Sequence, residues 1–166
     1  MQRYKKITIF GCPGSGKSTL AKQLSVKLGI PVYHLDLYFW LPGWVLKDEQ
    51  ERARLFKEMI TQDSWIIDGT FGSTTYQQRI EGADLLIYLD FPRWLCLWRC
   101  FKRMFQKKRI CTPEGCDESI SGRFLKYIWR FRKDKHPEIQ QIVEKYKDKS
   151  VVLHSPKEVA EFMCKP

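Results

Sequence analysis

The 166-residue chain is 43% hydrophobic and 14% aromatic, which predicts one folded domain over residues 1–166 and argues against global disorder. No apolar run approaches the roughly 20 residues that span a bilayer, and residues 1–6 lead straight into a glycine-rich motif. Both facts argue against a membrane-spanning protein and a removable signal peptide. We therefore expect a cytoplasmic protein, monomeric or dimeric, that has no membrane partner. Its formal net charge of +10 indicates that its partners are anionic.

Short β-rich segments alternate with longer amphipathic ones along the chain. In order, the pattern predicts a strand at 7–10, a helix at 18–28, a strand at 31–35, a helix at 48–61, strands at 65–67 and 85–89, a helix across 92–108, a strand at 151–153 and a short helix from Pro156. Strands joined by helical crossovers pair in parallel, and their continuous apolar runs indicate a sheet covered on both faces. The expected fold class is α/β, a three-layer fold whose five-stranded parallel sheet has helices on both faces and ligands at the carboxyl ends of its strands.

The junction between the first strand and the first helix carries a complete G-x4-G-K-S motif. It reads Gly11-Cys12-Pro13-Gly14-Ser15-Gly16-Lys17-Ser18, and Thr19 follows in the helix. Glycines let backbone N–H groups wrap around phosphate oxygens, and the helix N-terminus adds partial positive charge. Lys17 is expected to reach the β- and γ-phosphates, and Ser18 to give its hydroxyl to Mg²⁺. The motif predicts a P-loop NTPase fold that binds ATP and Mg²⁺ through residues 11–19, and the lack of an N-K-x-D motif disfavours a GTPase.

Residues 92–108 form the most aromatic of the helical segments. An apolar stripe at helical spacing consists of Trp94, Leu97, Trp98, Phe101 and Phe105. We expect this stripe to be core rather than a base-stacking platform. The stretch after it is rich in glycine, proline and serine, which predicts that residues 107–122 form a small mobile lid loop.

Six cysteines stand at positions 12, 96, 100, 111, 116 and 164. Since the chain shows no secretory signal and is large enough for a core, we expect reduced thiols. Cys111 and Cys116 form a C-x4-C pair, but a structural zinc needs four ligands and no second close pair follows. Zinc is therefore not expected.

Most of the positive charge is concentrated in residues 93–149, which hold sixteen Lys/Arg against seven Asp/Glu. A segment of this kind suits a nucleotide, a phosphorylated substrate or nucleic acid. Solvated helix faces are the alternative explanation for some of these lysines.

The loop sequence Gly-x-Pro-Gly-Ser-Gly-Lys-Ser resembles the adenylate and shikimate kinase group, and the resemblance implies roles for two carboxylates. Asp68 resembles the strand-end Asp-Gly of nucleoside-monophosphate kinases and is expected to order the water shell of Mg²⁺, with Asp90 as the competitor. Those kinases continue with Phe-Pro-Arg, whereas this chain reads Thr70-Phe71-Gly72. The chain thus departs from adenylate kinases themselves at this position.

Asp36 closes the predicted second strand. Shikimate-type kinases carry Asp-x-Asp at this strand end, and only Asp36 matches this pattern, since the first position is His34. The resemblance implies that Asp36 binds the acceptor hydroxyl and helps to accept its proton. The alternative is a helix N-cap or a turn residue. His34 is expected to be packed or hydrogen-bonded.

Arginines near the predicted lid complete the expected site. Arg99 and Arg103 lie four residues apart on one helix face, and they resemble the adenylate kinase pair that stacks on adenine and reaches phosphate. Arg123, Arg130 and Arg132 follow the loop. A guanidinium that closes over the transferred phosphoryl group stabilises its charge, and we choose Arg132 for this catalytic role.

Nearly the whole chain is similar to the bacterial adenylate-kinase-like P-loop proteins of the DNA topology modulation protein (FlaR-related) family. The similarity rests on residues 34–44, 65–69, 89–93 and 96–103. It implies a kinase-like fold, and the family name implies an effect on DNA that can be indirect.

Two functions fit these observations. The first is an ATP-dependent phosphotransferase that acts on a small-molecule acceptor, such as a nucleotide or nucleoside, with Asp36 and residues 40–44 at the acceptor pocket and residues 107–122 as the lid. The second is an ATP-dependent switch that binds DNA through its basic segment. No DNA-recognition element is visible, so any nucleic-acid binding is expected to be weak and non-specific.

Overall fold

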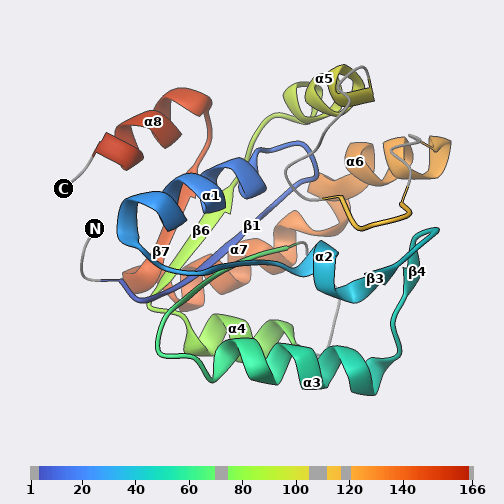
Figure 1. Ribbon diagram of the computed structural model, residues 1–166. Helices are drawn as coiled ribbons and strands as arrows, with labels where there is room; N and C mark the ends of the chain where they lie inside the picture. The colour runs from blue at the N-terminus through green and yellow to red at the C-terminus, as the bar shows by residue number, and fades with distance from the viewer. Residues whose placement is uncertain (1–3, 70–74, 105–111, 117–120, 165–166) are drawn as a thin grey trace.

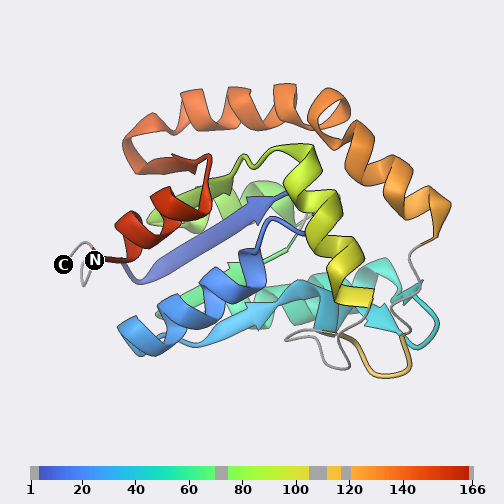
Figure 2. The same cartoon turned by 90° about the horizontal axis from the view of Figure 1, so that it is seen from above.

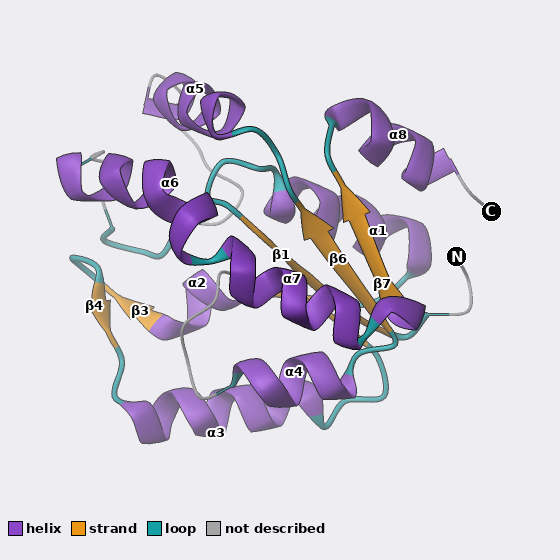
Figure 3. Ribbon diagram, turned by 180° about the vertical axis from the view of Figure 1, so that it is seen from behind, coloured by secondary structure: helices purple, strands orange, loops and turns teal. Residues whose placement is uncertain are grey.

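A computed structural model describes residues 4–69, 75–104, 112–116 and 121–164. Its centre is a parallel sheet with the strand order β2-β5-β1-β6-β7 (Figures 1 and 3). The strands are β1 (Lys6–Gly11), β2 (Val32–His34), β5 (Trp65–Asp68), β6 (Leu85–Leu89) and β7 (Ser150–Leu153). The predicted five-stranded parallel sheet is confirmed.

Helices cover both faces of this sheet. On one face lie α1 (Lys17–Leu28) and α8 (Pro156–Cys164), and on the other lie α3 (Glu49–Ile60), α4 (Tyr76–Gly82) and α7 (His136–Lys145), as Figures 1 and 3 show. At the carboxyl ends of the strands stand α5 (Arg93–Met104) and α6 (Gly122–Asp134). A short helix α2 (Leu35–Phe39) leads from β2 into the hairpin of β3 (Trp40–Leu41) and β4 (Val45–Leu46), and a 3-10 turn η1 (Lys147–Lys149) precedes β7.

The core forms where the central strands are covered on both sides. Every residue of β6 is buried, and so are Ile7, Ile9 and Phe10 of β1. Burial on both faces is what continuous apolar strands require. This burial fixes the positions of the strand ends, and with them the position of the loop between β1 and α1.

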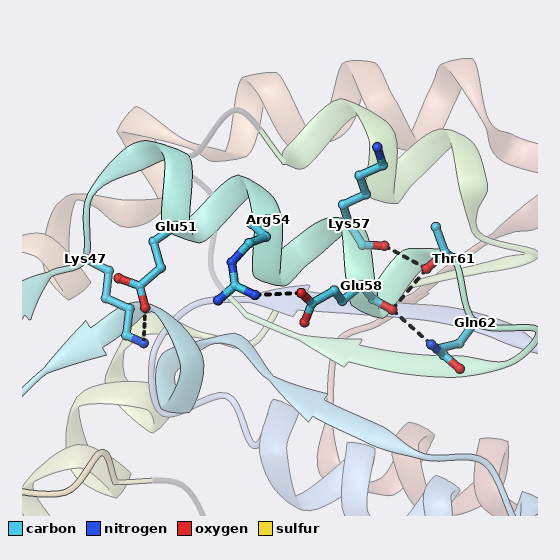
Figure 4. A network of polar contacts seen from close by, with 7 residues as sticks. All are labelled: Lys47, Glu51, Arg54, Lys57, Glu58, Thr61 and Gln62. Carbon is cyan, nitrogen blue, oxygen red and sulfur yellow. Dashed lines mark hydrogen bonds and ion pairs between the residues drawn. The ribbon is translucent and has the colours of Figure 1, made fainter.

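Polar side chains define the two ends of α3 (Figure 4). Asp48 caps its start by accepting from the N–H of Glu51, and Thr61 closes it by donating to the carbonyl of Lys57 at 2.9 Å. Ion pairs one turn apart join Lys47 to Glu51 and Arg54 to Glu58, each at 2.8 Å. The predicted helix at 48–61 is thus confirmed to within a residue at each end.

One local expectation was wrong, and some helices were not predicted. The strand predicted at 31–35 ends at His34, and Leu35 already begins α2, so Asp36 lies in the first turn of a helix rather than at a strand end. An acidic residue in this position is favoured by the helix dipole, which is a local effect that the strand prediction ignored. The helices α4, α6 and α7 were not predicted.

The aromatic stripe of α5 is not core, contrary to the prediction. Trp94, Trp98 and Phe101 keep 64%, 57% and 58% of their surface exposed, while Cys96 and Cys100 on the opposite side of the helix are buried. Small thiols fit the narrow space next to the β1–α1 loop, whereas indole rings do not. Phe105 lies outside the described residues.

Part of the predicted lid packs on the hairpin tip. Within residues 107–122 the structure describes 112–116 and 121–122. The carbonyl of Gly115 accepts from the N–H of Gly43 at 2.9 Å, and the Cys116 thiol donates to the carbonyl of Leu41 at 3.3 Å.

Among the described helices, none has the length and hydropathy that a membrane crossing requires.

Candidate nucleotide-binding site

The loop between β1 and α1 has the geometry of a phosphate cradle. Gly11, Gly14 and Gly16 have φ values of 150°, 83° and 99°, and the N–H of Ser15 donates to the carbonyl of Cys12 at 3.1 Å. Gly16 is the N-cap of α1 and has no side chain to cap the N–H groups of the first turn. These groups and the positive end of the helix dipole suit an anionic ligand.

Lys17 brings its charge into this loop. Its side chain is 9% exposed, and Nζ donates to the carbonyl of Cys12 at 3.2 Å. The buried hydroxyl of Ser15 has no hydrogen-bond partner within the described part of the chain. Ser18 is half-buried and Thr19 is exposed in the first turn of α1. An ammonium, a spare hydroxyl and open amides fit the phosphates of a nucleotide.

The loop is held against α5 at Gly14. A Cβ atom added there would lie 2.5 Å from the carbonyl oxygen of Cys96 and 2.8 Å from the sulfur of Cys100. With a φ of 83° as well, this position requires glycine. From the same helix, Nη1 of Arg99 donates to the carbonyl of Ser15 at 3.1 Å. The loop therefore has a second cation beside it, the guanidinium of Arg99.

Buried thiols fill the contact between the loop and α5. Cys12, Cys96 and Cys100 are buried, and all three are free thiols, as are Cys116 and Cys164. A hydrogen bond with Cys96, together with burial, raises the pKa of the Cys12 thiol, so this side chain is a neutral packing group. Cys111 lies outside the described residues.

Asp68 lies next to the loop at the end of β5. In the sheet register it is opposite Ile9 of β1 on one side and His34 of β2 on the other. Since a carboxylate only accepts, Nδ1–H of His34 donates to Oδ2 of Asp68, at 2.9 Å. The other oxygen, Oδ1, is buried without a partner among the described residues. His34 is hydrogen-bonded, as expected, and Asp68 keeps one oxygen available for a cation or its water shell.

A buried guanidinium near Asp68 was missed by the sequence analysis. Arg79 of α4 is 1% exposed, and burial lowers its pKa to about 10, against the opposing effects of Tyr76 and Asp68. Its Nε and Nη1 atoms lack partners in the described segments. Arg79 lies in a helix that was not predicted, so no sequence signal placed it here.

Asp36 of α2 and Tyr127 of α6 lie near each other. Asp36 is exposed in the first turn of α2. Burial raises the pKa of Tyr127 in α6 to about 12, and Cys12 and Asp36 add to the effect. The phenol of Tyr127 therefore lies near both residues. Nearby along the chain, the rings of Trp40 and Trp44 meet edge to face with centroids 5.6 Å apart. Tyr127 was not predicted, because nothing in the sequence distinguishes it from its helix neighbours.

Asp90 has polar partners of its own. The hydroxyl of Tyr88 donates to it at 3.3 Å, and the imidazole of His154 lies 3.5 Å away. Arg132 reaches the same carboxylate, with Nη2 at 3.8 Å from Oδ2. Arg103 donates to the sulfur of Cys100 at 2.8 Å. The structure thus brings Lys17, Arg99 and Asp68 around the loop, whereas Arg132 is directed to Asp90.

The chain is similar in sequence to a curated viral protein. No family model matches the chain. The uncharacterized protein ORF529 of Acidianus two-tailed virus is 28% identical in an alignment 158 residues long, which covers 87% of this chain but only 29% of the viral protein. The chain therefore spans less than a third of the length of that curated relative.

Solved structures of small-molecule kinases share the fold. A shikimate kinase from Acinetobacter baumannii, in complex with shikimate, matches with a TM-score of 0.67 at 12% identity over 98% of this chain and 90% of that one. A gluconokinase from Sinorhizobium meliloti gives 0.57 at 14% identity over 96% and 87%. A deoxyadenosine kinase from M. mycoides gives 0.52 at 19% identity over 95% and 96%. The chain therefore shares its fold with these kinases.

Proposed function

We propose that the chain is an ATP-dependent phosphotransferase that acts on a small-molecule acceptor, with nucleotides and nucleosides among the candidate acceptors. The observation that carries the proposal is the position of Lys17. Its ammonium lies inside a loop of open amides at a helix N-terminus, with the guanidinium of Arg99 on the same loop. Two cations and a cradle of N–H donors match the charge of a triphosphate.

The loop and the side chains around it have proposed roles in binding MgATP. Bound MgATP would supply the phosphoryl group. Lys17 and the backbone of residues 11–16 would hold its phosphates, Ser18 and Asp68 would hold Mg²⁺ directly or through water, and Thr19, Arg99 and Arg103 would contact the nucleotide. The spare oxygen of Asp68 and the spare hydroxyl of Ser15 support this assignment.

The acceptor side of the site is proposed to lie between α2 and α6. Asp36 would accept the proton of the acceptor hydroxyl, Tyr127 and residues 40–44 would line the pocket, and residues 107–122 would act as the lid. Arg132 would have to leave Asp90 to stabilise the transferred phosphoryl group. We further propose a single cytoplasmic domain, monomeric or dimeric, related to the DNA topology modulation proteins.

A second candidate function is an ATP-dependent DNA-binding switch. Its support is the charge of α5 and α6, which carry nine Lys/Arg and one acidic residue, Asp134. The order of loop, carboxylate and cations around Lys17 favours the phosphotransferase over this alternative.

The test is a screen of the purified protein with ATP and Mg²⁺ against nucleosides, nucleotides and small hydroxylated metabolites, with product read by mass. A phosphorylated product is expected with the wild type and not with Lys17→Ala, which should also lose ATP binding by calorimetry while keeping its circular dichroism spectrum. If Lys17→Ala binds ATP as the wild type does, the proposed site is wrong. If ATP binds but no acceptor is phosphorylated, the switch becomes the better account.

A further inference from the structure

One side of the molecule carries an exposed apolar surface that the nucleotide site does not use. Between α5 and α6 lies a hollow of about 600 Å³, which we call the aromatic groove. It is lined by Trp94, Leu97, Trp98, Phe101, Leu125, Lys126 and Trp129. Figures 1 and 2 show the two helices together at the end of the molecule opposite the chain termini.

Large apolar side chains of the groove are exposed to solvent. Trp94, Trp98 and Trp129 are 64%, 57% and 42% exposed, and Leu125 is 40% exposed. The opposite side of α5 packs on the nucleotide-binding loop through Cys96 and Arg99. The two sides of the helix are thus separate surfaces. Exposed apolar side chains gathered in one place are typical of an interaction surface.

The charge around the groove has one sign. Of the two helices that form it, α5 contains no acidic residue and α6 contains only Asp134, at its last position. Lys102 and Lys126 are exposed at the groove, and Arg93 and Arg130 stand on the same helices. The occupant that complements this surface is apolar where it enters the groove and anionic around it.

Charge argues against a second copy of the chain as the occupant. A two-fold interface would place the same basic helices against each other. The single carboxylate on these helices, Asp134, is already 3.1 Å from Nε of Arg130. Like charges would therefore face each other without compensation, which is unfavourable.

The arrangement of the rings argues against single-stranded nucleic acid, which binds by stacking bases on aromatic faces. The guanidinium of Arg93 lies 4.2 Å from the ring centroid of Trp129, and Nζ of Lys102 lies 5.2 Å from that of Trp98. Trp94 meets Trp129 edge to face, at 4.9 Å and 83°. Arg93 and Lys102 thus cover one face of Trp129 and one face of Trp98, which leaves fewer ring faces on which bases could stack.

Contrary to the expectation from the sequence that no membrane is a partner, we propose that the aromatic groove is a docking surface for an anionic lipid bilayer. Indole rings and aliphatic side chains partition into the boundary between headgroups and acyl chains without needing a free ring face. Lysines and arginines next to them pair with anionic headgroups while their alkyl stems cover apolar surface. Because no described helix can cross a bilayer, the contact is with the membrane surface. Docking and nucleotide binding use opposite sides of α5.

The test uses the purified protein with vesicles of two parts phosphatidylcholine to one part phosphatidylserine. We expect co-sedimentation and a blue shift of tryptophan emission, both lost in high salt and absent with pure phosphatidylcholine. Trp98→Ala should weaken binding by about tenfold, whereas Val26→Ala, an 80% exposed apolar residue on α1, should not. Lys102→Glu with Lys126→Glu should abolish binding, and the matched pair Lys22→Glu with Lys57→Glu, exposed on α1 and α3, should weaken it only slightly.

Several outcomes would overturn the proposal. One is equal binding to both kinds of vesicle or no binding to either, and another is equal effects of the two double charge reversals. Tighter binding of single-stranded oligothymidylate than of the anionic vesicles, with loss in Trp98→Ala, would assign the groove to nucleic acid instead. Lys17→Ala should dock as the wild type does, so failure of the phosphotransferase proposal leaves this test intact.

Discussion

Asp68 and Asp36 are carboxylates in different surroundings, so their roles can be separated by substitution. Asp68 is 4% exposed and accepts from His34, whereas Asp36 is exposed on α2. We expect Asp68→Asn to weaken the Mg²⁺ dependence of ATP binding, measured by calorimetry. Asp36→Asn should leave MgATP affinity intact and reduce transfer by about 10²–10⁴-fold, the usual contribution of a general base.

Asp63→Asn, at an exposed position before β5, is the control for loss of one negative charge. If Asp36→Asn abolishes ATP binding and Asp68→Asn does not, the two roles are exchanged. If neither substitution has an effect, the chemistry proposed here is wrong.

Gly14 and Gly29 both have positive φ values, 83° and 67°, but only Gly14 is in close contact. An added Cβ meets nothing within 4 Å at Gly29, and it meets the carbonyl of Cys96 at 2.5 Å at Gly14. Gly29→Ala should therefore cost only backbone strain, about 1–2 kcal/mol. Gly14→Ala should cost a further 1–3 kcal/mol, roughly, because the loop and α5 must separate. Urea denaturation measures both, and equal losses would contradict the close approach at Gly14.

At the scale of elements, periodicity predicted the helices at 18–28, 48–61 and 92–108 but missed α2, α4, α6 and α7, and it did not show that the aromatic side of α5 is exposed. The spacing of Trp94, Leu97, Trp98 and Phe101 is that of a helix, and α5 is one. Its buried side is set by a tertiary contact, the approach of Gly14, which sequence spacing does not record. Hydrophobicity alone would place tryptophans inside. The same reason explains why α4 and Arg79 were missed, since their position depends on the sheet they cover.

The start of α8 supplies an element-scale prediction about pH. Hydrogen bonds from the backbone N–H of His154 and the hydroxyl of Ser155 hold the pKa of Glu158 below its ordinary value. The ordinary pKa of a glutamate, about 4.3, applies in the unfolded chain. Because the pKa of Glu158 is lower in the folded protein, the ionised carboxylate stabilises the fold above about pH 4.3, and this stabilisation is lost as the pH falls through the folded-state pKa. Glu158→Gln should therefore lower Tm near neutral pH, with a difference that shrinks in acid.

Glu161→Gln is the control on the same helix, since its ion pair with Lys157 is long, at 3.9 Å, and exposed. It should leave Tm nearly unchanged at both pH values. A difference between wild type and Glu158→Gln that persists at low pH would show that the carboxylate charge is not responsible.

For the whole molecule, the sequence predicted a parallel sheet but not the order of its strands. In that order β5 lies next to β1 and β2 lies outside β5, so the end of β5, with Asp68, is nearer the loop than the end of β2 is. The pairing of His34 with Asp68 could not be predicted, because it depends on the register between β2 and β5. The position of Arg132 beside Asp90 likewise depends on how α6 crosses the end of the sheet.

The net charge of +10 leads to the last prediction, which concerns DNA. Lysines and arginines that neutralise phosphates release counterions but read no bases, so binding to duplex DNA should be weak, independent of sequence and steeply dependent on salt. Lys102→Glu with Lys126→Glu should reduce the slope of log affinity against log salt by about two, at roughly 0.9 for each phosphate that is no longer neutralised. Lys17→Ala should leave that slope unchanged, because the ammonium group of Lys17 lies inside the loop. Fluorescence anisotropy over a salt series measures both, and tight, sequence-selective binding at physiological salt would reverse the preference for a phosphotransferase.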